Sequence, residues 1–148
     1  MNSKSLRPLV LLGAAMLAGC GDILVTVPTE LSTPQRATFR ANRGGRLAAW
    51  SLLNVDWRGQ LGLRYDLTIS SLDGVVVGQA SCDALAVRVK LISVRSTSRG
   101  WHHRRQEARM ECNLSVPSEG EYTLQAAIIA EPRPEDLRMR QAAIRLRQ

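Results

Sequence analysis

Apolar and polar residues alternate along most of the chain after Phe39, with a period of two rather than 3.6. The clearest run covers residues 108–116, where one parity is small or apolar and the other holds Arg, Glu, Asn and Ser. The same alternation recurs in residues 63–69, 85–94, 122–130 and 137–146. Successive side chains of a strand point to opposite faces, so the pattern predicts strands with one apolar and one polar face.

Two positions interrupt the alternation. Leu91 and Ile92 are both apolar, and the apolar parity changes across them. One extra residue in a strand has this effect, so we expect a β-bulge or a strand bend there. The parity also shifts near Ala142 and Ala143 in the last segment.

Residues 46–57 fit either of two structures. Their larger apolar residues also stand at helical spacing, at Leu47, Trp50, Leu53 and Trp57. Glycines flank the segment on both sides, and every neighbouring segment is a predicted strand. We therefore expect a strand here as well.

Six to eight short strands separated by Gly, Pro and Ser turns predict an all-β fold, an antiparallel β-sandwich of immunoglobulin-like or jelly-roll-like type. Residues 119–124 (Glu-Gly-Glu-Tyr-Thr-Leu) resemble the tyrosine corner of immunoglobulin-like domains. In immunoglobulins the second cysteine follows that tyrosine, whereas here Cys112 precedes Tyr122 by ten residues. The resemblance thus supports a sandwich but not immunoglobulin topology.

The start of the chain has the pattern of a secretory signal. Lys4 and Arg7 precede an apolar stretch at residues 8–17, which is too short for the roughly 20 residues of a transmembrane helix. Leu17-Ala18-Gly19-Cys20 follows directly and resembles the lipobox of bacterial lipoproteins. The resemblance implies that a diacylglyceryl group joins the Cys20 thiol and that cleavage leaves Cys20 as the first residue. The alternative is an ordinary signal peptide cut at Ala18 or Gly19, with Cys20 free.

These features divide the chain into three parts. We expect a signal peptide at residues 1–19, a lipidated tether with one short strand at residues 20–38, and the sandwich at residues 39–148. Processing removes Lys4 and Arg7 and lowers the formal net charge from +7 to +5. No later uncharged run is long enough to cross a membrane, so we expect anchorage by lipid alone.

The expected location is the cell envelope. Gly21, rather than Asp, follows Cys20; among lipoproteins of enteric bacteria this favours the outer membrane, facing the periplasm. Export also removes the domain from nucleic acid, despite the positive net charge. The expected partners are the membrane and an envelope protein, a glycan or an anionic lipid.

Cys82 and Cys112 are the other two cysteines, and an oxidising compartment allows them one pairing. We therefore predict a disulfide; buried free thiols are the main alternative. A zinc site with His102 and His103 lacks the closely spaced ligand pairs that such sites show. We expect no metal and no cofactor.

The most basic segment runs from Arg99 to Arg105 and is expected to be a solvent-exposed hairpin tip. Its candidate ligand-binding residues, which could grip phosphates or carboxylates, are Arg99, Trp101, Arg104 and Arg105. The alternative is a solvated loop with little effect on the fold. The arginines of the last strand are expected to form a solvated face that discourages edge-to-edge pairing, at Arg138, Arg140, Arg145 and Arg147.

The function classes follow from these residues. Trp50, Trp57 and Trp101 raise the alternative of a carbohydrate-binding module, which would need an indole face open to solvent. The chain has no nucleophile elbow, zinc-protease or phosphate-loop motif, and so predicts no catalytic residue and no enzyme. An envelope hydrolase would need a carboxylate orienting His102 or His103. We expect a membrane-anchored envelope lipoprotein with a non-enzymatic binding or structural domain.

Overall fold

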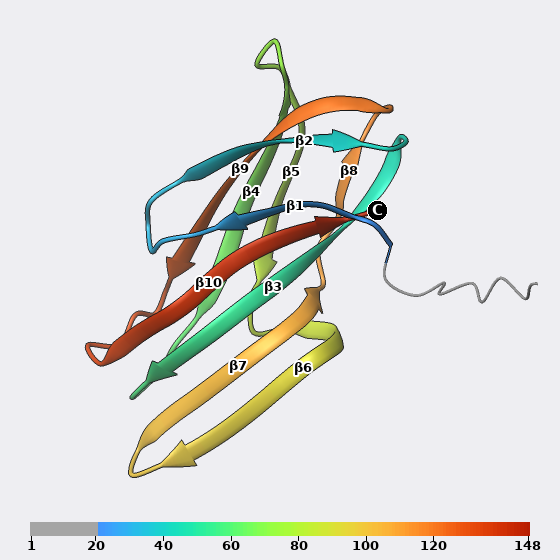
Figure 1. The fold of residues 1–148 in the computed structure, drawn as a ribbon. Coiled ribbons are helices and arrows are strands. Elements are labelled where there is room, and N and C mark those ends of the chain that lie inside the picture. Colours follow the sequence, from blue (N-terminus) through green and yellow to red (C-terminus); the bar gives the residue numbers. More distant parts are fainter. Residues whose placement is uncertain (1–20) are drawn as a thin grey trace, which may run out of the picture.

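The computed structural model describes residues 21–148, which form two antiparallel sheets packed as a sandwich (Figure 1). The predicted fold class is confirmed. Cys20 and the predicted signal peptide lie outside the described residues. The strands are β1 (Ile23–Pro28), β2 (Gln35–Ala41), β3 (Gly45–Trp57), β4 (Leu63–Ser71), β5 (Val76–Asp83), β6 (Val87–Ser98), β7 (Trp101–Met110), β8 (Leu114–Val116), β9 (Gly120–Ala130) and β10 (Leu137–Arg147).

One sheet has six strands and the other has four. The larger sheet has the order β1-β10-β3-β7-β6, with β8 also paired to β3. The smaller sheet has the order β2-β9-β4-β5. Figure 1 shows that the β6–β7 hairpin extends past the smaller sheet. β6, the outer strand of that hairpin, therefore lacks the opposing layer that covers the rest of the larger sheet.

The alternation produces the core as expected. The apolar parity of β4 and β9 is buried, at Leu63, Tyr65, Leu67, Ile69, Tyr122, Leu124, Ala126 and Ile128. The Tyr65 hydroxyl crosses the core and donates a hydrogen bond to the carbonyl of Ala143 in the other sheet, at 3.2 Å. Burial raises the pKa of Tyr65 to about 12, so the phenol remains a hydrogen-bond donor at neutral pH.

The sandwich begins earlier than predicted. Residues 20–38, expected to form a tether with one short strand, contain β1 and the first part of β2, which pair with β10 and β9. Val27 on β1 is 3% exposed and belongs to the core. The predicted boundary between tether and sandwich at residue 39 is therefore wrong. The short apolar run that starts at Ile23 pairs with β10, at the other end of the chain.

The local predictions about strands largely hold. Residues 46–57 lie in β3, as expected, and the register of β6 shifts between Lys90 and Ile92 at the predicted bulge. The register of β10 shifts slightly earlier than expected, between Met139 and Gln141. The run at residues 108–116 is interrupted, because β7 ends at Met110 and β8 starts at Leu114.

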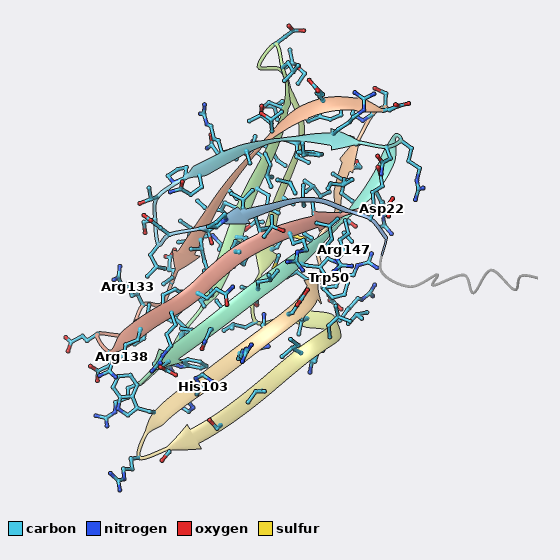
Figure 2. All side chains as sticks on the ribbon, in the orientation of Figure 1. Asp22, Trp50, His103, Arg133, Arg138 and Arg147 are labelled. Carbon is cyan, nitrogen blue, oxygen red and sulfur yellow. A yellow bond between two sulfur atoms is a disulfide. The ribbon has the colours of Figure 1, made fainter. Side chains whose placement is uncertain are left out.

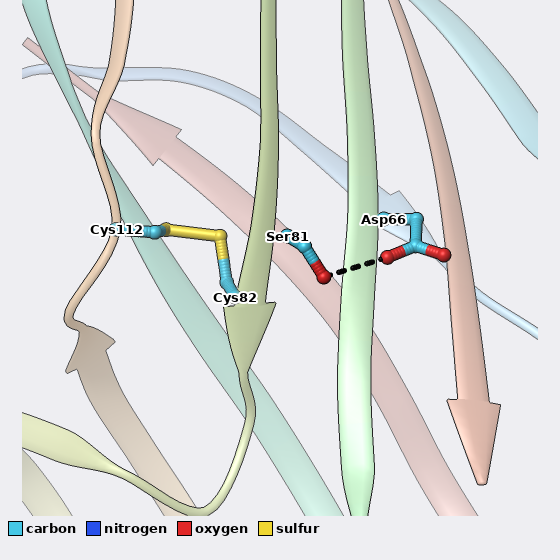
Figure 3. Close-up of a disulfide and its surroundings, with 4 residues drawn as sticks. All are labelled: Asp66, Ser81, Cys82 and Cys112. Atoms are coloured by element: carbon cyan, nitrogen blue, oxygen red, sulfur yellow. Dashed lines mark hydrogen bonds between the residues drawn. A yellow bond between two sulfur atoms is a disulfide. The ribbon is translucent and has the colours of Figure 1, made fainter. Parts of the chain in front are cut away.

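Two local features connect the parts of the sandwich. The Tyr122 hydroxyl donates to the carbonyl of Ser118 at 2.9 Å, which is the bond of a tyrosine corner. Cys82 in β5 and Cys112, between β7 and β8, are joined with their Cα atoms 5.3 Å apart (Figure 3). This pairing links the two sheets. Beside it, Ser81 donates to the Asp66 carboxylate at 2.9 Å.

Candidate binding surface

The predicted basic loop is mostly a strand. Only Arg99 and Gly100 form the turn, and their φ angles of 51° and 77° suit a tight two-residue hairpin. Residues 101–105 belong to β7. Their side chains therefore alternate between the two faces of the sheet, and the four candidate residues do not form one site.

Arg104 is the clearest correction. Its residue is 6% exposed, and its guanidinium donates to the carbonyl of Leu85 at 2.8 Å and to Gln106 at 2.6 Å. Gln106 in turn donates to the carbonyl of Ala84 at 2.6 Å. Arg104 therefore fixes the connection between β5 and β6 beneath β7. Arg105 points to the opposite face and is exposed, as predicted for a solvated residue.

The three tryptophans have different surroundings. Trp50 is 3% exposed, and the Trp57 ring stacks on His102 with centroids 5.2 Å apart. The guanidinium groups of Arg58 and Arg138 lie 5.0 and 4.4 Å from the centroid of the Trp101 ring. Trp50 is thus buried, whereas Trp57 and Trp101 are partly exposed and each has another side chain against its ring. The carbohydrate-binding alternative stays a prediction for these two indoles.

The arginines of the last strand do not protect an edge. β10 lies between β1 and β3 inside the larger sheet. Arg145 donates to Glu107 at 2.6 Å, and the Arg147 guanidinium lies 5.1 Å from the centroid of Trp50. Their side chains are only 20% and 11% exposed. The predicted solvated face is correct for Arg138 and Arg140, which are exposed, but not for this pair.

A carboxylate orients one of the two histidines. Asp56 in β3 contacts His103 Nδ1 at 2.5 Å through Oδ1, and accepts a hydrogen bond from Arg140 Nε at 2.8 Å through Oδ2. Ser96 in β6 is the cross-strand neighbour of His103, which is itself the neighbour of Asp56. Asp56, Ser96 and His103 line a shallow pocket together with Trp101. Alternation along each strand could place Asp56, His103 and Ser96 on one face of its own strand. Only the register between β3, β7 and β6 shows that the three residues are neighbours.

The Asp56 carboxyl is held in its charged form. Burial raises its pKa, but the hydrogen bonds from His103 and Arg140 outweigh burial and hold the pKa below its ordinary value. A carboxyl with a lowered folded-state pKa stabilises the fold above its unfolded pKa of about 4, and this contribution is lost as the pH falls through the folded pKa.

We therefore expect Asp56→Asn to be less stable than wild type by about 1 kcal/mol at pH 7. The difference should shrink as the pH falls below about 4, where the unfolded carboxyl is protonated. Urea unfolding of both proteins across this pH range measures the effect. A difference that stays constant with pH would show that the Asp56 charge contributes nothing.

β6 is a long strand at the uncovered edge of the larger sheet. Its apolar side chains are exposed, with Val89 at 48%, Leu91 at 50%, Ile92 at 40% and Val94 at 49%. β6 also carries three cations and no acid, and only Arg88 pairs with a carboxylate within residues 21–148, at 2.8 Å from Glu111. The alternation at residues 85–94 predicted this strand, but it did not reveal that no second sheet covers it.

Comparison with protein-family models, curated proteins and solved structures finds no match for this chain. Among residues 21–148, no helix is long and apolar enough to cross a membrane. In the same part of the chain, no group of three or more His, Cys, Asp or Glu side chains is placed to hold a metal ion. The β6 edge and the Asp56–His103 pair are the candidate functional features of residues 21–148.

Proposed function

We propose that this chain is a lipoprotein of the cell envelope, anchored through Cys20 to the outer membrane. Its sandwich is a non-enzymatic binding domain that adds an extended segment of another envelope protein to the edge of β6. The observation that carries the binding role is the β6 edge itself, twelve residues long, with exposed apolar side chains. The anchorage rests on the signal and lipobox pattern.

The backbone of an edge strand supplies the affinity in this type of recognition. Its outward N–H and C=O groups lack partners in the sheet, and an added strand hydrogen-bonds to them. The apolar side chains of β6 would pack against alternate side chains of the added strand.

The charges of β6 define the chemistry of the partner. Arg88, Lys90 and Arg95 lie on the strand without an acidic residue among them. A partner segment that alternates apolar and acidic residues would complement both features. A second copy of this chain fits less well, because pairing two β6 strands would place the same cations against each other.

A substitution on β6 tests the binding role. The probe is a peptide of the length of β6 that alternates valine and glutamate, and the comparison peptide has lysine in place of glutamate. We expect the wild-type protein to prefer the acidic peptide. Ile92→Asp should weaken that binding at least about tenfold, because it removes an apolar contact and adds a like charge. Isothermal titration calorimetry measures both affinities.

Ile23→Asp is the matched control. Ile23 is 53% exposed and lies on β1, at the opposite edge of the same sheet. Both substitutions are at exposed positions and should change stability by no more than about 0.5 kcal/mol. The binding proposal is wrong if the two variants bind the acidic peptide equally, or if the protein dimerises through β6 instead.

The Asp56–His103 contact favours a second candidate, an envelope hydrolase with Ser96 as nucleophile. A carboxylate that orients a histidine beside a serine is the arrangement that activates a hydroxyl nucleophile. Against it, Arg140 occupies the other Asp56 oxygen, and no hydrogen bond joins Ser96 to His103 in the described residues. Labelling of Ser96 by a fluorophosphonate, lost in Ser96→Ala, would favour the hydrolase; the binding proposal predicts no labelling.

A further inference from the structure

We propose that one end of the sandwich, called here the anchor end, rests on the membrane surface and binds anionic lipid headgroups. The anchor end consists of Asp22, Gln148, the β2–β3 turn and the tip of the β4–β5 hairpin at residues 72–76. The inference rests on the proposed anchorage at Cys20 and adds the orientation of the domain and the lipid chemistry that it recognises.

The chain leaves no room for a flexible linker. Only Gly21 lies between Cys20 and Asp22, and Asp22 is already fixed to the sandwich. The Asp22 N–H donates to the Gln148 carbonyl at 2.8 Å, and the Gln148 N–H donates to the Asp22 carbonyl at 3.0 Å. One residue spans at most about 3.6 Å. An acylated Cys20 therefore holds this end of the sandwich against the bilayer.

The β2–β3 turn and the hairpin tip lie at the same end. The Gln148 side chain accepts the N–H groups of Asn42 and Arg43 at 2.9 and 3.2 Å, so the turn is next to the C-terminus. β9 starts beside the end of β2 and beside the end of β4. The tip that follows β4 therefore projects from this end. Figure 1 shows the turn and the entry of the chain at the right of the view, with the tip projecting at the top.

The hairpin tip is apolar and uncovered. Leu72, Val75 and Val76 are 63%, 62% and 51% exposed, and Gly74 makes the turn with a φ of 85°. Together with Ile23 and those of β6, these are the large apolar side chains left exposed among the described residues. Asp73 sits between them, so the tip suits the level of the headgroups rather than the hydrocarbon core.

A cluster of arginines lies beside the chain entry. Arg46, Arg109 and Arg147 line a pocket with Gly21, Trp50 and Gln148, and no Asp or Glu side chain lines it; Glu107 lies outside the lining, 3.7 Å from the Arg147 guanidinium. Figure 2 shows Trp50 and Arg147 next to Asp22, where the chain enters β1. The buried Nε atom of Arg147 has no hydrogen-bond partner within the described part of the chain.

Guanidinium groups bind phosphate through paired hydrogen bonds, and Arg is the preferred residue for this contact. The periplasmic leaflet of the outer membrane presents lipid phosphates at its surface. An anchored Cys20 would hold this pocket at the level of those phosphates. The arginine pocket and the apolar tip would then contact the same membrane surface. The arginines would bind the headgroup phosphates, and the tip would insert between headgroups.

Hydrogen–deuterium exchange on the acylated protein tests the inference. The mature protein is purified from membranes, and mass spectrometry first establishes the acyl chains on Cys20. It is then compared in detergent, in phosphatidylcholine vesicles, and in vesicles of phosphatidylglycerol and phosphatidylethanolamine. We expect exchange in residues 72–76 to slow at least about threefold in the anionic vesicles relative to both other conditions.

Two double variants at exposed positions separate the specific effect from bulk charge. Arg46→Gln with Arg109→Gln should return the exchange at residues 72–76 to its rate in neutral vesicles. Arg99→Gln with Arg105→Gln removes the same charge from the opposite end of β7 and should leave the protection intact. Equal exchange in detergent and in anionic vesicles, with Cys20 acylated, would overturn this inference and leave the anchorage standing. A Cys20 without acyl chains would overturn both.

Discussion

Replacing Cys82 and Cys112 together with alanine should lower the free energy of unfolding by about 3–4 kcal/mol. The two cysteines are 30 residues apart in the sequence, and their pairing ties β5 to the segment that follows β7. Without it, the unfolded chain gains the freedom of an open loop of that length. The smaller side chain at the fully buried Cys82 adds a small packing loss.

Urea unfolding under oxidising conditions measures this difference. Wild-type protein with a reducing agent is the control, because it should unfold close to the double variant. A loss below about 1 kcal/mol would contradict the expectation that the pairing constrains the unfolded chain. Two alkylatable thiols in protein purified without reductant would show that the pairing does not form.

Arg104→Ala should lower the free energy of unfolding by about 2–3 kcal/mol, which is unusual for an arginine in a basic surface segment. The Arg104 guanidinium is buried and bonds to the Leu85 carbonyl and to Gln106. Its loss leaves the part-buried carbonyl of Leu85 and the buried amide oxygen of Gln106 without their donor, which costs desolvation free energy at both atoms.

Arg105→Ala is the matched control for this prediction. Arg105 is the next residue and carries the same charge, but it is exposed on the other face of β7. Its loss should cost no more than about 0.5 kcal/mol. Denaturant titrations of the two variants compare them directly. Equal stability would show that net charge in the hairpin matters more than the bonds of Arg104.

Local patterns predicted the strands because alternation is a property of neighbouring residues. The β-bulge at Leu91 and Ile92 and the strand at residues 46–57 are both visible within a few positions of sequence. The inward position of Arg104 could have been found in the same way, because the buried parity of Ala108 continues back through Gln106 to Arg104. The cluster of Arg, His and Gly residues favoured a loop and hid that continuation.

Other features depend on contacts between distant residues. β1 is a strand because the end of the chain pairs with it, and a short apolar run followed by Pro28 does not reveal that partner. The contact between Asp56 and His103 depends on the register of β3 and β7. The exposure of β6 depends on how far the second sheet extends. The position of the candidate binding surface on β6 therefore follows from the arrangement of the two sheets and not from the local sequence pattern.

The proposed envelope location and the proposed membrane contact both depend on anchorage at Cys20, and one measurement tests it most directly. Wild type and Cys20→Ser are expressed in a bacterial host, the membranes are separated from the soluble fraction, and the intact mass of each protein is determined. If Cys20 is the anchor, wild type sediments with membranes, begins at Cys20 and carries acyl chains there. Cys20→Ser should lack the acyl mass and either be released after export or remain as the unprocessed precursor. Wild type without acyl chains, or a Ser variant still membrane-bound and cut after Gly19, would contradict it.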